Sequence, residues 1–221
     1  MTLRHCLALA LALTACTDEG PSGEADILAI GDSLLDFNTP DSDITTVAAE
    51  ALGMTHEMGA VGGTTLLGDD NAAIPGSYVN GDYRLLIVSG GGNDLGEGCT
   101  CGVDCAPILD ELISADASSG VVVELVNQAV SDGKQVAWVG YMCPMADAEE
   151  FSGCNDELDV LDTRTALLDE GEANMVYIKG SDLGTGQEAE LYAEDGYHPS
   201  PEGSRVLGEA VAERVSAEWP E

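Results

Sequence analysis

The sequence predicts a single-domain α/β protein, built as a three-layer α/β/α sandwich around a central parallel sheet of about five strands. Short apolar segments alternate along the chain with segments of amphipathic helical periodicity, which is typical of a parallel sheet covered by helices on both faces. The 221 residues, 44% of them hydrophobic, suit one globular domain and are too apolar for a disordered chain.

Five short apolar runs are predicted as the strands, because strands that are buried on both faces are continuous hydrophobic segments. The run RLLIVS at 84–89 is the clearest of them. The predicted strands span residues 26–30, 55–61, 84–89, 135–141 and 174–178.

Four helices are predicted between and after these strands. The first, 43–52, has apolar side chains at helical spacing, with Asp41 or Ser42 as its cap and Gly53 at its end. The second helix ends at Gly133 and has an apolar face of Val122, Leu125, Val126, Ala129 and Val130. The third spans 157–169. The last helix has Ser200 as N-cap and Pro201 in its first turn, and its apolar face consists of Leu207, Ala210, Val211 and Val215.

Polar and glycine-rich segments follow the predicted strands, at the edge where parallel sheets bind their ligands. These segments are Gly31-Asp32-Ser33-Leu34, the turn at 59–64 with Gly62 and Gly63, Gly90-Gly91-Gly92-Asn93-Asp94, and Asp195-Gly196-Tyr197-His198 before the last helix. The predicted fold brings all four segments to one edge of the sheet.

Ser33, His198 and Asp195 are the candidate catalytic residues. A serine hydroxyl is a poor nucleophile until a base takes its proton. His198 is the candidate base, because His5 lies in a predicted leader and His56 opens a predicted strand as a surface or packing residue. Asp195, three positions before His198, is close enough to fix the imidazole tautomer, as a catalytic triad requires.

Attack on an ester creates an oxyanion, which needs hydrogen-bond donors already in position. The backbone N–H of Ser33, a glycine N–H in the Gly62-Gly63 turn and the side-chain amide of Asn93 are the candidate donors. Asp32 and Asp94 are interpreted as turn residues that accept hydrogen bonds from backbone N–H groups, with an indirect role in the site as the alternative.

GDSL at 31–34, the Gly62-Gly63 turn, GGND at 91–94 and DGYH at 195–198 together resemble the four sequence blocks of the SGNH/GDSL hydrolases, in the same order. The resemblance implies a flavodoxin-like sheet, a triad of Ser33, His198 and Asp195, and an oxyanion hole from Ser33, Gly63 and Asn93. The second block departs from the family, which often has an asparagine several residues before its glycine. The choice between Gly62 and Gly63 therefore stays open.

The formal net charge is -34, from 7 basic and 41 acidic residues. So acidic a surface repels nucleic acids and anionic membranes, which excludes both as direct electrostatic partners. The charge is interpreted as a solvated surface, because no calcium-binding EF-hand loop is present. No metal or other cofactor is expected.

The first residues resemble the leader of a bacterial lipoprotein. A short n-region with one Arg and a short apolar stretch precede Leu13-Thr14-Ala15-Cys16, which is similar to a lipobox. We expect a signal peptide at 1–15, a lipid-anchored tether at 16–24 with Cys16 acylated, and the hydrolase domain at 25–221. An ordinary secretory signal peptide is the alternative, and both imply export to the periplasm or cell surface.

Five further cysteines are candidates for disulfide bonds in an oxidising compartment. We expect Cys143 to pair with Cys154, and two of Cys99, Cys101 and Cys105 to pair with each other. A three-thiolate metal site is the alternative for the latter group.

The expected function is hydrolysis of carboxylic esters, acyl or acetyl, through an acyl-enzyme on Ser33. The substrate could be a small molecule, a lipid or a glycan ester, and the membrane is contacted only through the N-terminal anchor. Two alternatives remain: an acyl or acetyl transferase that modifies polysaccharide with the same site, and a surface lipoprotein that binds without catalysis. The sequence does not indicate the oligomeric state.

Overall fold

The computed structural model describes residues 21–68, 73–101, 104–148 and 150–220. The predicted signal peptide and the first part of the tether, including Cys16, lie outside these described residues. Within them, no helix is long and apolar enough to cross a bilayer.

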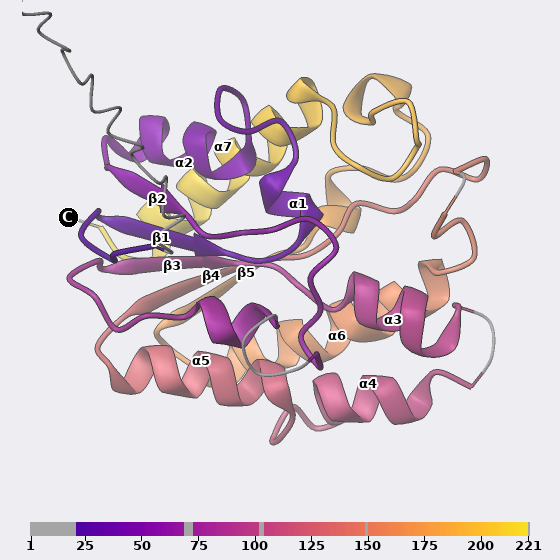
Figure 1. Ribbon diagram of the computed structural model, residues 1–221, viewed down its shortest axis with the longest axis horizontal. Helices are drawn as coiled ribbons and strands as arrows, with labels where there is room; N and C mark the ends of the chain where they lie inside the picture. Colours follow the sequence, from indigo (N-terminus) through magenta and orange to yellow (C-terminus); the bar gives the residue numbers. More distant parts are fainter. Residues whose placement is uncertain (1–20, 69–72, 102–103, 149, 221) are drawn as a thin grey trace, which may run out of the picture.

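A five-stranded parallel sheet forms the centre of the protein, which confirms the predicted fold class (Figure 1). The strand order is β2-β1-β3-β4-β5, and every neighbouring pair is parallel. The strands are β1 (Ile27–Ile30), β2 (His56–Met58), β3 (Leu85–Val88), β4 (Gln135–Val139) and β5 (Met175–Ile178).

Helices cover both faces of this sheet (Figure 1). On one face lie α1 (Ser33–Asp36), α2 (Ile44–Leu52) and α7 (Pro201–Glu218). On the other lie α3 (Gly92–Cys99), α4 (Ala106–Leu112), α5 (Val121–Ser131) and α6 (Asn155–Gly171). Short 3₁₀ turns at Ile74–Ser77, Gly180–Asp182 and Ala189–Leu191 lie in the connections.

Four of the strands are almost entirely hydrophobic because both of their faces are buried, whereas the edge strand β2 has the half-buried sequence HEM. Ile27 and Ala29 of β1 face the core under α2 and α7, whereas Leu28 and Ile30 face the core under α5 and α6. All four of these side chains are fully buried. Successive side chains of a strand alternate between faces, so a run without polar residues builds both cores at once.

The sequence did not predict α1, α3 and α4. Helix α3 has the sequence GNDLGEGC, and its glycines read as a turn because glycine is a poor helix former. Helix α4 is only seven residues long, below the length at which helical periodicity is distinctive. The predicted strand at 55–61 is also shorter in the structure, although Gly59 and Val61 still donate backbone hydrogen bonds to Ala29 and Gly31.

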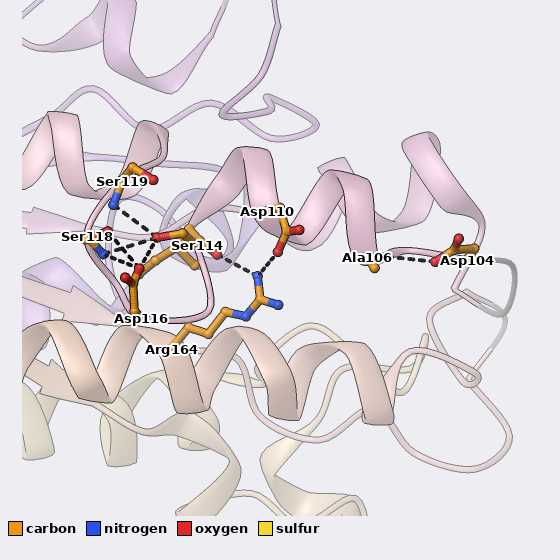
Figure 2. A network of polar contacts seen from close by, with 9 residues as sticks. Asp104, Ala106, Asp110, Ser114, Asp116, Ser118, Ser119 and Arg164 are labelled. Atoms are coloured by element: carbon orange, nitrogen blue, oxygen red, sulfur yellow. Dashed lines mark hydrogen bonds and ion pairs between the residues drawn. The ribbon is translucent and has the colours of Figure 1, made fainter.

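Arg164 of α6 holds the end of α4 in place (Figure 2). Its guanidinium donates to the Asp110 carboxylate at 2.8 Å and to the Ile113 carbonyl oxygen at 2.7 Å. In the next turn, the Ser114 hydroxyl and the Asp116 carboxylate accept hydrogen bonds from the backbone at Ser118. The Arg164 contacts thus join α4 to α6.

The described residues contain two disulfide bonds, Cys99–Cys105 and Cys101–Cys154. The pairing of two cysteines among Cys99, Cys101 and Cys105 is confirmed, but the predicted Cys143–Cys154 bond is wrong. Because all three cysteines of that group lie in disulfides, the alternative of a three-thiolate metal site is wrong as well.

The predicted Cys143–Cys154 bond is absent because backbone hydrogen bonds hold Cys143 against another segment of the chain. Its N–H donates to the Gly184 carbonyl oxygen, and its own carbonyl oxygen accepts from the Tyr192 hydroxyl. Cys154 instead caps the start of α6, with its Cα atom 4.7 Å from that of Cys101. Proximity in sequence was therefore a poor guide to proximity in space.

Peptide mapping without reduction should recover Cys99–Cys105 and Cys101–Cys154, with Cys143 labelled by an alkylating reagent. This follows from the Cα–Cα separations of 5.3 Å and 4.7 Å, which lie within the range that disulfides require. Recovery of a Cys143–Cys154 peptide would contradict the observed connectivity.

Candidate active site

Ser33 lies directly after β1, as the first residue of α1. Asp32 caps this helix, and its Oδ1 accepts a hydrogen bond from the Leu34 N–H at 3.0 Å. Gly31 permits the close approach of β1 to the end of β3, because a Cβ atom there would lie 2.8 Å from the Ser89 carbonyl oxygen. The N–H of Ser33 has no partner inside its helix, since the first N–H groups of any helix lack one.

His198 and Asp195 lie in the turn before α7. The His198 Nδ1 is 2.8 Å from the Asp195 Oδ2, and the Asp195 Oδ1 accepts from the N–H groups of Tyr197 and His198. Gly196 has a φ of +79°, a conformation that glycine adopts without strain. The tight turn thus brings the carboxylate back onto the imidazole of a residue only three positions away.

These hydrogen bonds also set the charge of Asp195. Burial acts to raise the pKa of this carboxyl, but the hydrogen bonds from the His198 ring and from the N–H groups of His198 and Tyr197 outweigh it. The pKa therefore lies below its ordinary value, and the group is a carboxylate at neutral pH.

Aromatic rings on both sides fix the imidazole. Phe37 stacks on His198 with ring centroids 4.4 Å apart and planes within 6°, and the Tyr197 ring is tilted on it at 4.2 Å. Asn38 joins the Phe37 loop to α7, because its amide donates to the Pro199 carbonyl oxygen and to the Ser204 hydroxyl. The His198 Nε2 is buried and has no hydrogen-bond partner among the described residues.

Asn93 and Asp94 hold the loop at 64–67 against the start of α3. The Asn93 amide nitrogen donates to the Thr64 carbonyl oxygen at 2.8 Å, and the Asp94 carboxylate accepts from the N–H groups of Leu66 and Leu67. An amide nitrogen has two hydrogens, so the Thr64 contact leaves Asn93 one further donor. Burial raises the pKa of Asp94.

The structure distinguishes between Gly62 and Gly63. The Gly62 N–H donates to the Asp36 carboxylate at 3.0 Å, so it is already in use. The Gly63 N–H makes no hydrogen bond within the part of the chain that the structure describes. Gly63 therefore has the free donor in this turn.

The predicted residues meet at one edge of the sheet. Ser33, Asn93 and His198 line the same small cavity, of about 30 Å³. The same three residues and Gly63 also border an adjoining groove of about 540 Å³. Asp195 contributes through its contact with His198.

Tyr141 also lines the small cavity, although the sequence motifs did not indicate it. Its hydroxyl donates to the Asp32 Oδ2 at 2.5 Å and accepts from the Gly92 N–H at 3.0 Å. Burial raises the pKa of Asp32 and raises that of Tyr141 well above its usual range, so the phenol keeps its proton. Tyr141 thereby connects the helix that begins with Ser33 to the helix that contains Asn93. Its position just after β4 was the signal that could have indicated it.

No family model and no curated protein matches this chain. Solved structures do match it over most of its length. A protein from Slackia heliotrinireducens described as an SGNH hydrolase is 20% identical, with a TM-score of 0.62 over 86% of this chain and 97% of its own. An acetylxylan esterase from Geobacillus stearothermophilus is 15% identical, with a TM-score of 0.63 over 89% of this chain and 96% of its own.

A member of the lipolytic G-D-S-L family from Veillonella parvula is 14% identical, with a TM-score of 0.58 over 85% of this chain and 96% of its own. At these identities the likeness shows the fold. The protein thus has the fold of the SGNH hydrolases.

The carboxylate of Asp195 should make stability depend on pH. Because its pKa is lowered in the folded protein, the ionised group stabilises the fold above the ordinary value of about 4, and this contribution is lost as pH falls through the lowered value. The stability difference between wild type and Asp195→Asn should therefore be constant above about pH 5 and shrink below about pH 4. Chemical denaturation at pH values above about 5 and below about 4 measures this stability difference. An equal difference in the two pH ranges would count against the lowered pKa of Asp195.

Proposed function

We propose that the protein is a serine esterase of the SGNH/GDSL family. The observation on which this rests is a single cavity that contains a helix N-terminal serine hydroxyl and a histidine whose buried Nε2 is unpartnered among the described residues. The other ring nitrogen of that histidine is held by Asp195 at 2.8 Å. The structural similarity to esterases supports the proposal.

In this mechanism Ser33 attacks the acyl carbon of the ester. The proton of its hydroxyl passes to the His198 Nε2, while the Asp195 carboxylate holds Nδ1–H and stabilises the imidazolium. The imidazolium then returns the proton to the departing alcohol, which leaves an acyl group on Ser33. Water, deprotonated by the same nitrogen, hydrolyses this acyl-enzyme.

The tetrahedral intermediates place a negative charge on the former carbonyl oxygen. The N–H of Ser33, the N–H of Gly63 and the second amide hydrogen of Asn93 are the proposed donors to this oxyanion. Tyr141 and Asp94 keep these donors in position, because they fix the start of α3 against β1 and the 64–67 loop. Donors that are already oriented need no reorganisation when the charge forms.

Ser33→Ala should abolish hydrolysis of p-nitrophenyl acetate, because the proposed mechanism then has no nucleophile to attack the ester. The matched control is Ser131→Ala, which removes an exposed hydroxyl on α5. Steady-state kinetics with the mature domain measures both. Equal activity of Ser33→Ala and wild type would remove Ser33 as the nucleophile.

Asn93→Ala should lower kcat by about 10²- to 10³-fold, the usual cost of losing one oxyanion donor. The variant also loses its bond to the Thr64 carbonyl oxygen, so its thermal unfolding midpoint is recorded alongside. A folded variant with near-normal kcat would exclude Asn93 from the oxyanion hole.

We also propose that the mature chain is exported and anchored through acylated Cys16. The two disulfides support an oxidising compartment. In cells fed a palmitate probe, Cys16→Ser should lose the label, whereas Cys6→Ser should keep it, because Cys6 lies in the proposed signal peptide. Unchanged labelling of Cys16→Ser would rule out the anchor.

A further inference from the structure

Phe151 lies where the small cavity and the adjoining grooves meet. It lines the cavity of about 30 Å³ that contains Ser33, the groove of about 540 Å³ beside it, and a further groove of about 540 Å³ that reaches Cys154. Among the described residues, Asn93 is the only other one that lines the cavity and both grooves. Phe151 therefore borders spaces of very different size next to Ser33.

The two kinds of space differ in chemistry as well as in size. Met142, Pro144 and Leu158 form apolar walls of the small cavity. Its volume has room for about two water-sized groups. The large groove is bordered by the acidic residues Glu97 and Glu150 and also by the aromatic residues Phe37 and Tyr197. An ester at Ser33 would bury its apolar acyl group in the small cavity and leave its larger alcohol in the wide groove, beside Glu97 and Glu150.

Several contacts hold Phe151 in this place. Cys154, whose N–H donates to the Phe151 carbonyl oxygen at 2.9 Å, is bonded to Cys101 just beyond α3. The ring packs at 5.1 Å on Tyr197, and a Cβ atom at Gly96 of α3 would lie only 2.9 Å from it. The disulfide and the absent side chain at Gly96 thus bring the ring against the helix that contains Asn93.

The backbone of Phe151 supports the same conclusion. Its φ is +60°, in the left-handed region that bulky residues rarely adopt. Such a conformation persists only where the surroundings enforce it, and such positions gather at functional sites.

We propose that Phe151 is a specificity-determining residue that limits the substrate to short acyl groups, acetyl or propionyl, by closing the acyl cavity. This inference rests on the proposed esterase function and adds to it the substrate class. The Cys101–Cys154 disulfide sets the limit indirectly, by fixing the segment that contains Phe151.

The test compares kcat/KM for p-nitrophenyl acetate, butyrate and octanoate. Wild type should prefer acetate, and Phe151→Ala should raise the octanoate-to-acetate ratio by at least about tenfold, since one methylene in an apolar pocket alters discrimination by about 10- to 200-fold. Phe151→Leu should give an intermediate ratio. Leu158→Ala enlarges the same cavity from α6 and should shift the ratio in the same direction.

The matched control is Leu167→Ala, which truncates an exposed side chain of the same helix α6 and should leave the ratio unchanged. Circular dichroism confirms that each variant is folded. A wild type that prefers octanoate, or an unchanged ratio in folded Phe151→Ala, would overturn the inference while Ser33-dependent hydrolysis still supports the esterase. Absence of Ser33-dependent hydrolysis for every ester would overturn the esterase itself, and the inference with it.

Discussion

The burial of four of the five parallel strands on both faces is the constraint on which this structure depends. A strand between two helical layers has no place for polar side chains, so the polar groups of the chain lie at the strand ends. All five strands run in the same direction, and their carboxyl ends therefore lie at one edge. Ser33 follows β1, Gly63 follows β2, Asn93 follows β3 and Tyr141 follows β4, so the sheet itself gathers the candidate site.

Carboxylates then hold the turns around the site; those of Asp32 and Asp94 accept from distant segments, whereas that of Asp195 accepts within its own turn. Asp32 accepts from Tyr141, Asp94 from the 64–67 loop, and Asp195 from His198. Burying a carboxylate is costly unless it is hydrogen-bonded, and burial does raise the pKa of Asp32 and Asp94. The acidic composition of the chain is thus partly structural, with buried acceptors that orient the turns around Ser33.

The sequence was sufficient for the sheet and for the local motifs, because these depend on short-range patterns. Apolar runs located four of the five strands, and the segments that follow the strands predicted that Ser33, Asn93 and His198 share one edge of the sheet. The interpretation of Asp94 as an acceptor for backbone N–H groups is confirmed, although its donors Leu66 and Leu67 lie in a distant loop. Asp32 has both of the roles considered for it. It accepts a hydrogen bond from a backbone N–H as the cap of α1, and it acts on the site indirectly by binding the Tyr141 hydroxyl.

What the sequence missed depends on contacts between distant segments. Cys101 and Cys154 are 53 residues apart, and no local pattern indicates that they pair. The roles inferred for Phe151 and Tyr141 arise the same way, from packing against α3 and from a hydrogen bond to Asp32. Helix α3 was missed because its glycines favour a turn in isolation, yet Gly96 leaves room for the Phe151 ring.

The central claim, that His198 activates Ser33 as a nucleophile, can be tested without knowing the substrate. A fluorophosphonate probe reacts with activated serines, and tandem mass spectrometry identifies the modified residue. The account predicts a single adduct on Ser33 in wild type and none in His198→Ala. An adduct on another residue, or no reaction of the folded wild type, would contradict it.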